Sequence, residues 1–223
     1  MTRFVNAPNI QNFVNAAVSR VRYFLGFDPT LNSYGQLSTA FTPAGSFKIK
    51  GKFSTTSTDS QFMYSRWDSS TDNRSIFIRY DSNTVEVRIS GDGSDVLATT
   101  VAYTPVGKYS LFEFTFNSST NIILDVDGVT STTTHAFSSV FNADTSVYIS
   151  SQTASANFFN GVLADFELTD LDTPANSQAY RLDRATGTTE SSLVNTGTLT
   201  YNNIPEADRE QFKLVGATNW INI

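Results

Sequence analysis

The sequence predicts an all-β protein, a two-sheet antiparallel sandwich with one amphipathic helix before it. From Leu37 onwards, apolar residues occupy every second position in several short runs, which is the spacing of strands with one buried face. Clusters of Gly, Asn, Asp and Ser separate these runs about every eight to twelve residues, as in sandwiches and barrels. Strands do not alternate with helical segments, so a parallel α/β sheet is not expected.

Residues 9–25 carry the predicted helix, because their apolar residues recur at spacings of three and four. The segment has basic residues and no acid before Asp28. It is either docked on its own domain or used for attachment and self-association. The positions predicted to make these contacts are Ile10, Phe13, Val14, Ala17, Val21 and Phe24.

The first strong strand signal is residues 47–53, where Lys48, Lys50 and Lys52 alternate with apolar residues. We expect a half-buried antiparallel strand with a ladder of lysines on its wet face. Residues 76–89 alternate on both sides of Asp81-Ser82-Asn83, which predicts a hairpin.

Three phenylalanines at alternate positions in residues 112–116 predict an aromatic inner face. The next strand runs into Asp127-Gly128, a strong signal for a type I′ hairpin turn. Residues 162–168 form the last clear core strand. We therefore divide the chain into a helical attachment or oligomerisation segment (1–30), the sandwich (31–173) and a C-terminal tail packed on the sandwich or on a neighbour (174–223).

Composition narrows the function classes. The net charge is −6, and with three arginines and no acid in residues 1–27 the remainder carries −9. Such an acidic body argues against nucleic acid as a partner. The absence of cysteine excludes disulfides, thiolate nucleophiles and Cys-ligated metals. No apolar run approaches about 20 residues, so we expect no membrane insertion, and the N-terminus lacks a standard secretory signal.

Three segments carry a family resemblance. FKIKGKF at 47–53, IILDVDGV at 122–129 and FNGVLADF at 159–166 resemble strands of concanavalin A-like (laminin-G-like) jelly rolls. Residues 176–183 and 194–202 are similar to tails on such domains in tailed-bacteriophage structural proteins. The resemblance implies a two-sheet jelly roll that binds glycans or proteins, and in some members hydrolyses or cleaves polysaccharides.

Candidate catalytic groups are sparse. Glycoside hydrolysis needs paired carboxylates, and Asp125/Asp127 and Asp165/Glu167 have the right spacing on a strand. We interpret both pairs as surface acids, because Asp127 belongs to a turn and the second pair opposes the apolar face. The only histidine is His135, and no G-x-S-x-G motif occurs. We predict that the chain is not an enzyme.

Two loops, residues 68–73 and 90–95, are rich in oxygen ligands but do not match an EF-hand, so we assign no metal and no cofactor. Glycan binding would use exposed aromatic rings beside planar polar groups. One strand end offers that combination, although a tryptophan at a loop edge more often fills the core. The candidate glycan-binding residues are Tyr64, Arg66, Trp67, Asp68, Asn73 and Arg74.

Together these features favour a non-enzymatic bacteriophage virion protein, in a head decoration, a tail or a fibre. Its expected location is the virion, assembled in the host cytoplasm. Its expected partners are other virion proteins and copies of itself, with a trimer favoured. The alternative is a lectin-like module that recognises cell-surface polysaccharide. A polysaccharide lyase or glycoside hydrolase is the third reading.

Overall fold

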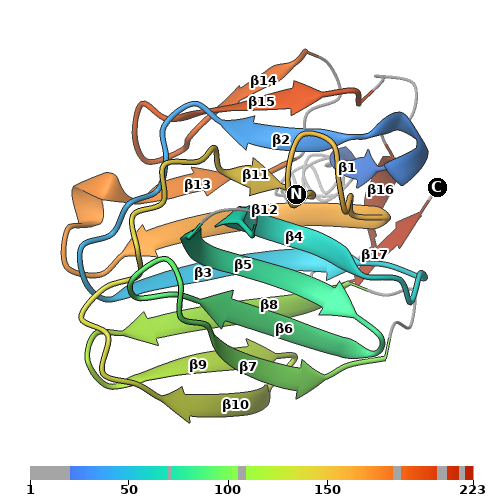
Figure 1. Cartoon of the computed structure of the whole chain (residues 1–223). Helices are drawn as coiled ribbons and strands as arrows, with labels where there is room; N and C mark the ends of the chain where they lie inside the picture. The colour runs from blue at the N-terminus through green and yellow to red at the C-terminus, as the bar shows by residue number, and fades with distance from the viewer. Residues whose placement is uncertain are drawn as a thin grey trace, which may run out of the picture.

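The computed structural model describes residues 21–69, 72–104, 109–182, 187–204, 210–215 and 219–222. Within these residues, two antiparallel sheets face each other as a sandwich (Figure 1). The predicted fold class is confirmed. None of the helices in the described part of the chain has the length and hydropathy to span a bilayer; the helical elements are the short 3-10 turns η1 (Pro29–Leu31) and η2 (Pro174–Asn176).

The larger sheet has nine described strands in the order β10-β9-β8-β3-β12-β1-β16-β17, with β13 also paired to β12. Their bounds are β1 (Val21–Phe27), β3 (Phe47–Ser54), β8 (Ser110–Asn117), β9 (Asn121–Val126), β10 (Val129–Thr134), β12 (Gly161–Asp170), β13 (Gln178–Tyr180), β16 (Glu210–Val215) and β17 (Asn219–Asn222).

The smaller sheet has eight described strands in the order β14-β15-β2-β11-β4-β5-β6-β7. Their bounds are β2 (Tyr34–Leu37), β4 (Gln61–Asp68), β5 (Asn73–Asp81), β6 (Thr84–Ile89), β7 (Leu97–Ala102), β11 (Tyr148–Ile149), β14 (Thr189–Ser191) and β15 (Thr198–Asn202).

Aromatic rings fill the space between the sheets. Phe47 stacks on Phe116 with ring centroids 5.2 Å apart, and Phe112 meets Phe166 edge to face at 5.8 Å. Each of these four residues is at most 1% exposed. Fully burying a side chain of this size contributes about 1.5–3 kcal/mol, so these rings are a main source of the free energy that holds the layers together.

Both predicted hairpins form. Asp127 and Gly128 have φ values of 51° and 85° between β9 and β10, which is the positive-φ pair of a type I′ turn. Ser82 and Asn83, with φ of 48° and 65°, make the corresponding turn between β5 and β6. Asn tolerates the left-handed region better than most residues, and the turn consists of two residues rather than the three that the sequence indicated.

The lysine ladder also forms, on the outer face of the larger sheet. Lys48 Nζ lies 2.7 Å from Glu113 on β8. Lys50 Nζ lies 2.9 Å from Glu167, and Lys52 Nζ lies 2.7 Å from Asp165, both on β12. Each lysine of the ladder therefore has an acid on a neighbouring strand.

Residues 21–25 are a correction to the predicted helix. Val21, Phe24 and Leu25 lie in β1, whose residues pair with β16 and β12. Hydrogen bonding to two distant strands overrides the local helical spacing, and the β-branched and aromatic residues of this segment suit a strand. The remaining predicted attachment positions, Ile10, Phe13, Val14 and Ala17, lie outside the described residues.

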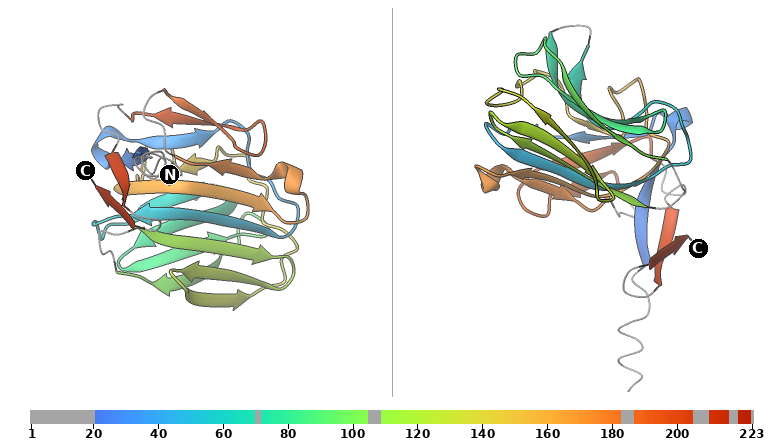
Figure 2. Two further views of the ribbon diagram at one scale, coloured as in Figure 1. Left: turned by 180° about the vertical axis from the view of Figure 1, so that it is seen from behind. Right: turned by 90° about the horizontal axis from the view of Figure 1, so that it is seen from below.

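Strands from beyond residue 173 join the same two sheets. β13 pairs with β12, and β15 pairs with β2. The extension formed by β1, β16 and β17 projects from the edge of the sandwich (Figure 2). It lies at the end opposite to that where β2 and β4 finish, at Leu37 and Asp68 (Figure 1).

Candidate functional site

Tyr64 and Trp67 are buried and do not form an exposed stacking platform, and Trp67 has the core role that its position favours. Tyr64 is 0% exposed and its ring stacks on Phe166 of the opposite sheet, 6.0 Å between centroids. Trp67 is 5% exposed and packs edge to face on Phe77 at 4.9 Å, in a small cluster separate from the main core. The cause is that β4 is covered on both faces along almost its whole length.

Asp68, Asn73 and Arg74 hold the strand ends and loops together. Asp68 and Asn73 are register partners at the end of the β4–β5 ladder. The Oδ1 atom of Asn73 accepts a hydrogen bond from the backbone N–H of Asp144 at 2.8 Å, and Arg74 Nη1 donates to the carbonyl of Ser94 at 2.7 Å. These contacts are structural, but the first one positions Asp144, which lines a hollow described below.

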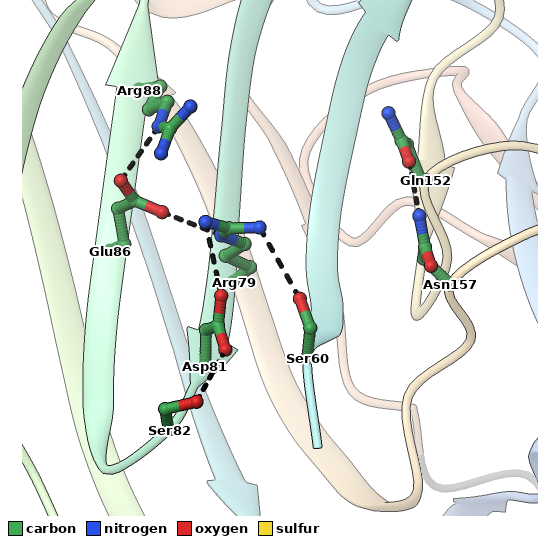
Figure 3. Close-up of polar contacts among 8 residues, drawn as sticks. All are labelled: Ser60, Arg79, Asp81, Ser82, Glu86, Arg88, Gln152 and Asn157. Carbon is green, nitrogen blue, oxygen red and sulfur yellow. Dashed lines mark hydrogen bonds and ion pairs between the residues drawn. The ribbon is translucent and has the colours of Figure 1, made fainter.

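The outer face of the smaller sheet carries a charged network (Figure 3). The guanidinium of Arg79 lies 5.4 Å from the ring centroid of Phe77, and its Nε donates to Glu86 at 2.6 Å. Its Nη2 lies 3.1 Å from Asp81, while Arg88 Nε donates to the other oxygen of Glu86 at 2.7 Å. Two cations and two carboxylates balance, so this network does not call for an ionic ligand.

The carboxylates considered for catalysis are engaged elsewhere. Asp125 accepts hydrogen bonds from Gly128 N and Thr130 Oγ1 at 2.9 and 2.8 Å, and Asp127 accepts from Leu111 N at 2.9 Å. Asp165 and Glu167 belong to the lysine ladder. These acids thus serve turns and ion pairs.

His135 has a structural environment. Its Nδ1 accepts from the backbone N–H of Phe137 at 3.0 Å, and its ring stacks on Phe116 with centroids 4.7 Å apart. In the loop of residues 90–95, backbone hydrogen bonds from Asp95 and Ser94 lower the pKa of Asp92, as expected of an Asx turn. Among the described residues, no group of three or more His, Asp or Glu is placed to hold a metal ion.

Arg66 occupies a different environment from the other charged residues. It is 6% exposed and crosses from β4 to two loop segments at the end of the sandwich. Its Nη1 donates to the carbonyl of Phe41 at 3.3 Å, and its Nη2 donates to Asn142 Oδ1 at 2.6 Å and to the carbonyl of Ala143. The side chain thereby ties residues 36–44 to residues 139–147.

We call the space between these two segments the rim groove, which contains two hollows. The Gln36 hollow has a volume of about 600 Å³, and the Arg66 hollow has a volume of about 280 Å³. The Gln36 hollow is lined by Gln36, Leu37, Ser38, Ala40, Asp144, Thr145, Ser146, Val147 and Thr200. The Arg66 hollow is lined by Thr42, Pro43, Ala44, Arg66, Ser139, Val140, Phe141 and Asn142.

A tyrosine pair stands beside the Gln36 hollow. Tyr148 is the register partner of Gln36, and its ring meets that of Tyr34 edge to face with centroids 5.6 Å apart. Both tyrosines are partly exposed. Gln36 Nε2 donates to Ser146 Oγ at 3.1 Å, which fixes the amide across the groove. Hydroxyls, an amide, a carboxylate and nearby aromatic rings are the groups that hold sugars.

Residues 35–172, well over half of the chain, match the sequence profile of the concanavalin A-like lectin/glucanases superfamily. The chain belongs to this superfamily. No curated protein matches it in sequence.

Several solved structures share the superfamily fold. A protein from Bacteroides ovatus, provisionally assigned as carbohydrate-binding, superposes with a TM-score of 0.60 at 14% identity, over 82% of this chain and 59% of that one. Domains LG4-5 of the mouse laminin α1 chain give 0.55 at 15% identity, over 84% and 47%. A heptameric SAP-like pentraxin from Limulus polyphemus gives 0.50 at 11% identity, over 67% and 75%. The chain thus spans only about half the length of the first two.

The residues of the rim groove, apart from Arg66, were not among the sequence candidates. They come from segments around positions 36–44, 139–147 and 200, which only the concanavalin A-like sheet order brings together. One signal was available. Between β10 and β11 the chain runs for residues 135–147 without a strand, and loops of this length are often functional.

Proposed function

We propose that this chain is a carbohydrate-binding module of the concanavalin A-like superfamily, with its binding site in the Gln36 hollow. The observation that carries the proposal is the lining of that hollow, in which Gln36, Ser146 and Thr200 offer donors and acceptors beside a partly exposed tyrosine pair. The hollow lies within the range of about 300–1,000 Å³ typical of ligand sites. The fold shared with a Bacteroides ovatus protein provisionally assigned as carbohydrate-binding supports the same reading.

The test is a glycan array probed with the full chain, followed by titration of the best ligand into two matched variants. Thr200→Val removes a hydroxyl from the hollow, whereas Thr100→Val removes an exposed hydroxyl from β7, on the same sheet. We expect Thr200→Val to weaken binding about 3–10-fold, the effect of one hydrogen bond, and Thr100→Val to leave it unchanged. The assignment would be overturned if the chain bound no glycan on the array, or if both variants bound the ligand with equal affinity.

The proposed module acts without catalysis. The spaced carboxylates Asp125, Asp127, Asp165 and Glu167 support this, because turns and lysines engage them. Incubation of the chain with the glycans it binds should release no reducing ends and no unsaturated sugar. Release of either product would make the chain a hydrolase or a lyase.

A second candidate is display on a bacteriophage particle, with copies of the chain assembled as a homo-oligomer, most simply a trimer. The observation in its favour is the extension of β1, β16 and β17, which projects from the edge of the sandwich, away from the end where β2 and β4 finish (Figures 1 and 2). The resemblance of residues 176–183 and 194–202 to phage protein tails favours it too. The mass of the intact chain in solution tests the assembly, and mass spectrometry of purified particles tests the location. A monomer missing from particles would eliminate this role.

A further inference from the structure

We propose that the Arg66 hollow binds the carboxylate of an acidic sugar, and that Arg66 supplies the positive charge for it. The inference rests on the proposed function and deepens it, because it names the class of glycan. Such a glycan would place its acidic residue in the Arg66 hollow and a neutral neighbour in the Gln36 hollow.

The first step is the charge of Arg66. Its hydrogen-bond partners are two backbone carbonyls and one amide oxygen, all of them neutral. Its Nε has no partner, and none of the ion pairs of the described residues includes it. A buried charge without an opposite charge is unfavourable, so this guanidinium would gain from an incoming anion.

The second step is that no acid forms a direct ion pair with Arg66 among the described residues. Burial lowers the pKa of Arg66, whereas Tyr64 and, at longer range, Asp144 raise it; an arginine stays protonated at neutral pH. Burial raises the pKa of the Tyr64 hydroxyl, so that group is neutral and brings no negative charge. Asp144 is exposed and lines the other hollow.

The third step is access. Arg66 lines a hollow of about 280 Å³ that has no acid in its lining. Thr42, Ser139 and Asn142 line the same hollow and can bind the sugar hydroxyls around a carboxylate. The volume is slightly below that of sites for drug-sized ligands, which suits one sugar unit rather than an oligosaccharide.

The fourth step is direction along the rim groove. Asp144 lines the Gln36 hollow and would repel a second carboxylate there, whereas Arg66 lines the adjoining hollow and attracts one. The chain as a whole carries −6 and so disfavours general polyanions. A glycan with one acidic unit next to a neutral unit fits the attraction by Arg66, the repulsion by Asp144 and the negative net charge of the chain.

The experiment compares each of two acidic sugars, methyl glucuronoside and N-acetylneuraminic acid, with its own carboxyl methyl ester. Titration of the full chain is followed by NMR, in which the Nε–H signal of Arg66 reports on the guanidinium of this lining residue. We expect at least one acid to bind about tenfold more tightly than its ester and to shift that signal. Because the wild-type chain is used, the measurement does not depend on a variant that folds.

Two variants complete the test. Arg66→Gln should abolish the preference for the acid over the ester, and Arg66→Lys should retain part of it. Arg88→Gln, on the outer face of the smaller sheet, should leave the preference unchanged. Equal binding of acid and ester, or no shift of the Arg66 signal, would overturn the inference. If neutral glycans still bind and Thr200→Val weakens that binding, the proposed carbohydrate-binding function stands without the acidic-sugar site. If no glycan binds at all, the proposed function and this inference are both wrong.

Discussion

The lysine ladder and the rim groove show two ways in which this protein holds positive charge. On the outer face of the larger sheet, Lys48, Lys50 and Lys52 are about two-fifths exposed, and each has an acid within 2.9 Å. In the rim groove, Arg66 is 6% exposed and donates hydrogen bonds only to neutral oxygens. Each lysine of the ladder has a direct ion pair, whereas Arg66 interacts with an acid, Asp144, only at longer range.

This difference between paired and unpaired cations indicates which charged residue could bind a ligand, because the other charges serve the structure. Exposed ion pairs contribute about 0–1 kcal/mol, and here they link β3 to β8 and β12. A buried cation with neutral partners keeps an unsatisfied preference for an anion. Three stability measurements test this contrast, and they are given in order of decreasing expected change in the free energy of unfolding.

The largest effect is expected from Arg66→Met. The substitution removes the donor from the carbonyls of Phe41 and Ala143, and each buried acceptor left unpaired costs about 1–3 kcal/mol. We expect the free energy of unfolding to fall by about 2–4 kcal/mol in urea denaturation. The matched change Lys52→Met, in the ladder, should cost less than about 1 kcal/mol. Equal losses in the two variants would remove the distinction between the two regions.

A smaller change in the free energy of unfolding is expected from the ionisation of Tyr180 at high pH. Tyr180 is buried like Arg66, but it is neutral at pH 7. Burial and the nearby Glu190 raise its pKa from 10.0 to about 12. Because the folded pKa is the higher one, its contribution to stability is complete below about pH 10. It is lost as the pH rises towards 12, since only the unfolded chain ionises there. A pKa difference of about 2 corresponds to about 3 kcal/mol, which solvent screening reduces to roughly 1–2 kcal/mol.

Urea denaturation at pH 8 and pH 11 measures this effect. The wild-type chain should lose more stability over that interval than Tyr180→Phe, which cannot ionise. Tyr180 donates a hydrogen bond to Gln178 Oε1 at 3.0 Å, so the variant is also somewhat less stable at pH 8. Parallel losses in both proteins would show that Tyr180 does not contribute to the alkaline transition.

The smallest effect concerns salt. Lys50→Met should lower the free energy of unfolding by less than about 1 kcal/mol at low ionic strength and by almost nothing at 1 M NaCl, where screening extends over only about 3 Å. The effect of Arg66→Met should depend less on salt, because its hydrogen-bond partners are neutral oxygens rather than an opposite charge. Equal salt dependence of Lys50→Met and Arg66→Met would contradict this distinction.

Most of the sandwich could be predicted from the sequence, because its strands alternate clearly. The alternation of apolar residues and lysines in residues 47–53 predicts which face of that strand is buried, and Asp127-Gly128 predicts the turn between β9 and β10. Strand β1 could not be predicted, since residues 21–25 also fit a helical spacing and the choice depends on pairing with β16, almost 190 residues later.

The site was harder to predict than the fold. Residues 61–67 do not alternate, so the sequence does not tell which rings are exposed, and the structure buries both Tyr64 and Trp67. Arg66 was among the candidates, but as part of an exposed cluster. Its real surroundings depend on carbonyl groups of Phe41 and Ala143, and a backbone group carries no signature in a sequence.

The extension formed by β1, β16 and β17, which projects from the edge of the sandwich, has a consequence for valency (Figure 2). Copies tethered through this extension to a common base would leave their sugar sites clear of that base. A surface densely coated with the same glycan could then be gripped at several points at once. Weak single contacts combined in this way gain about 10²–10⁴ in avidity, so a modest affinity in solution would be compatible with firm adhesion.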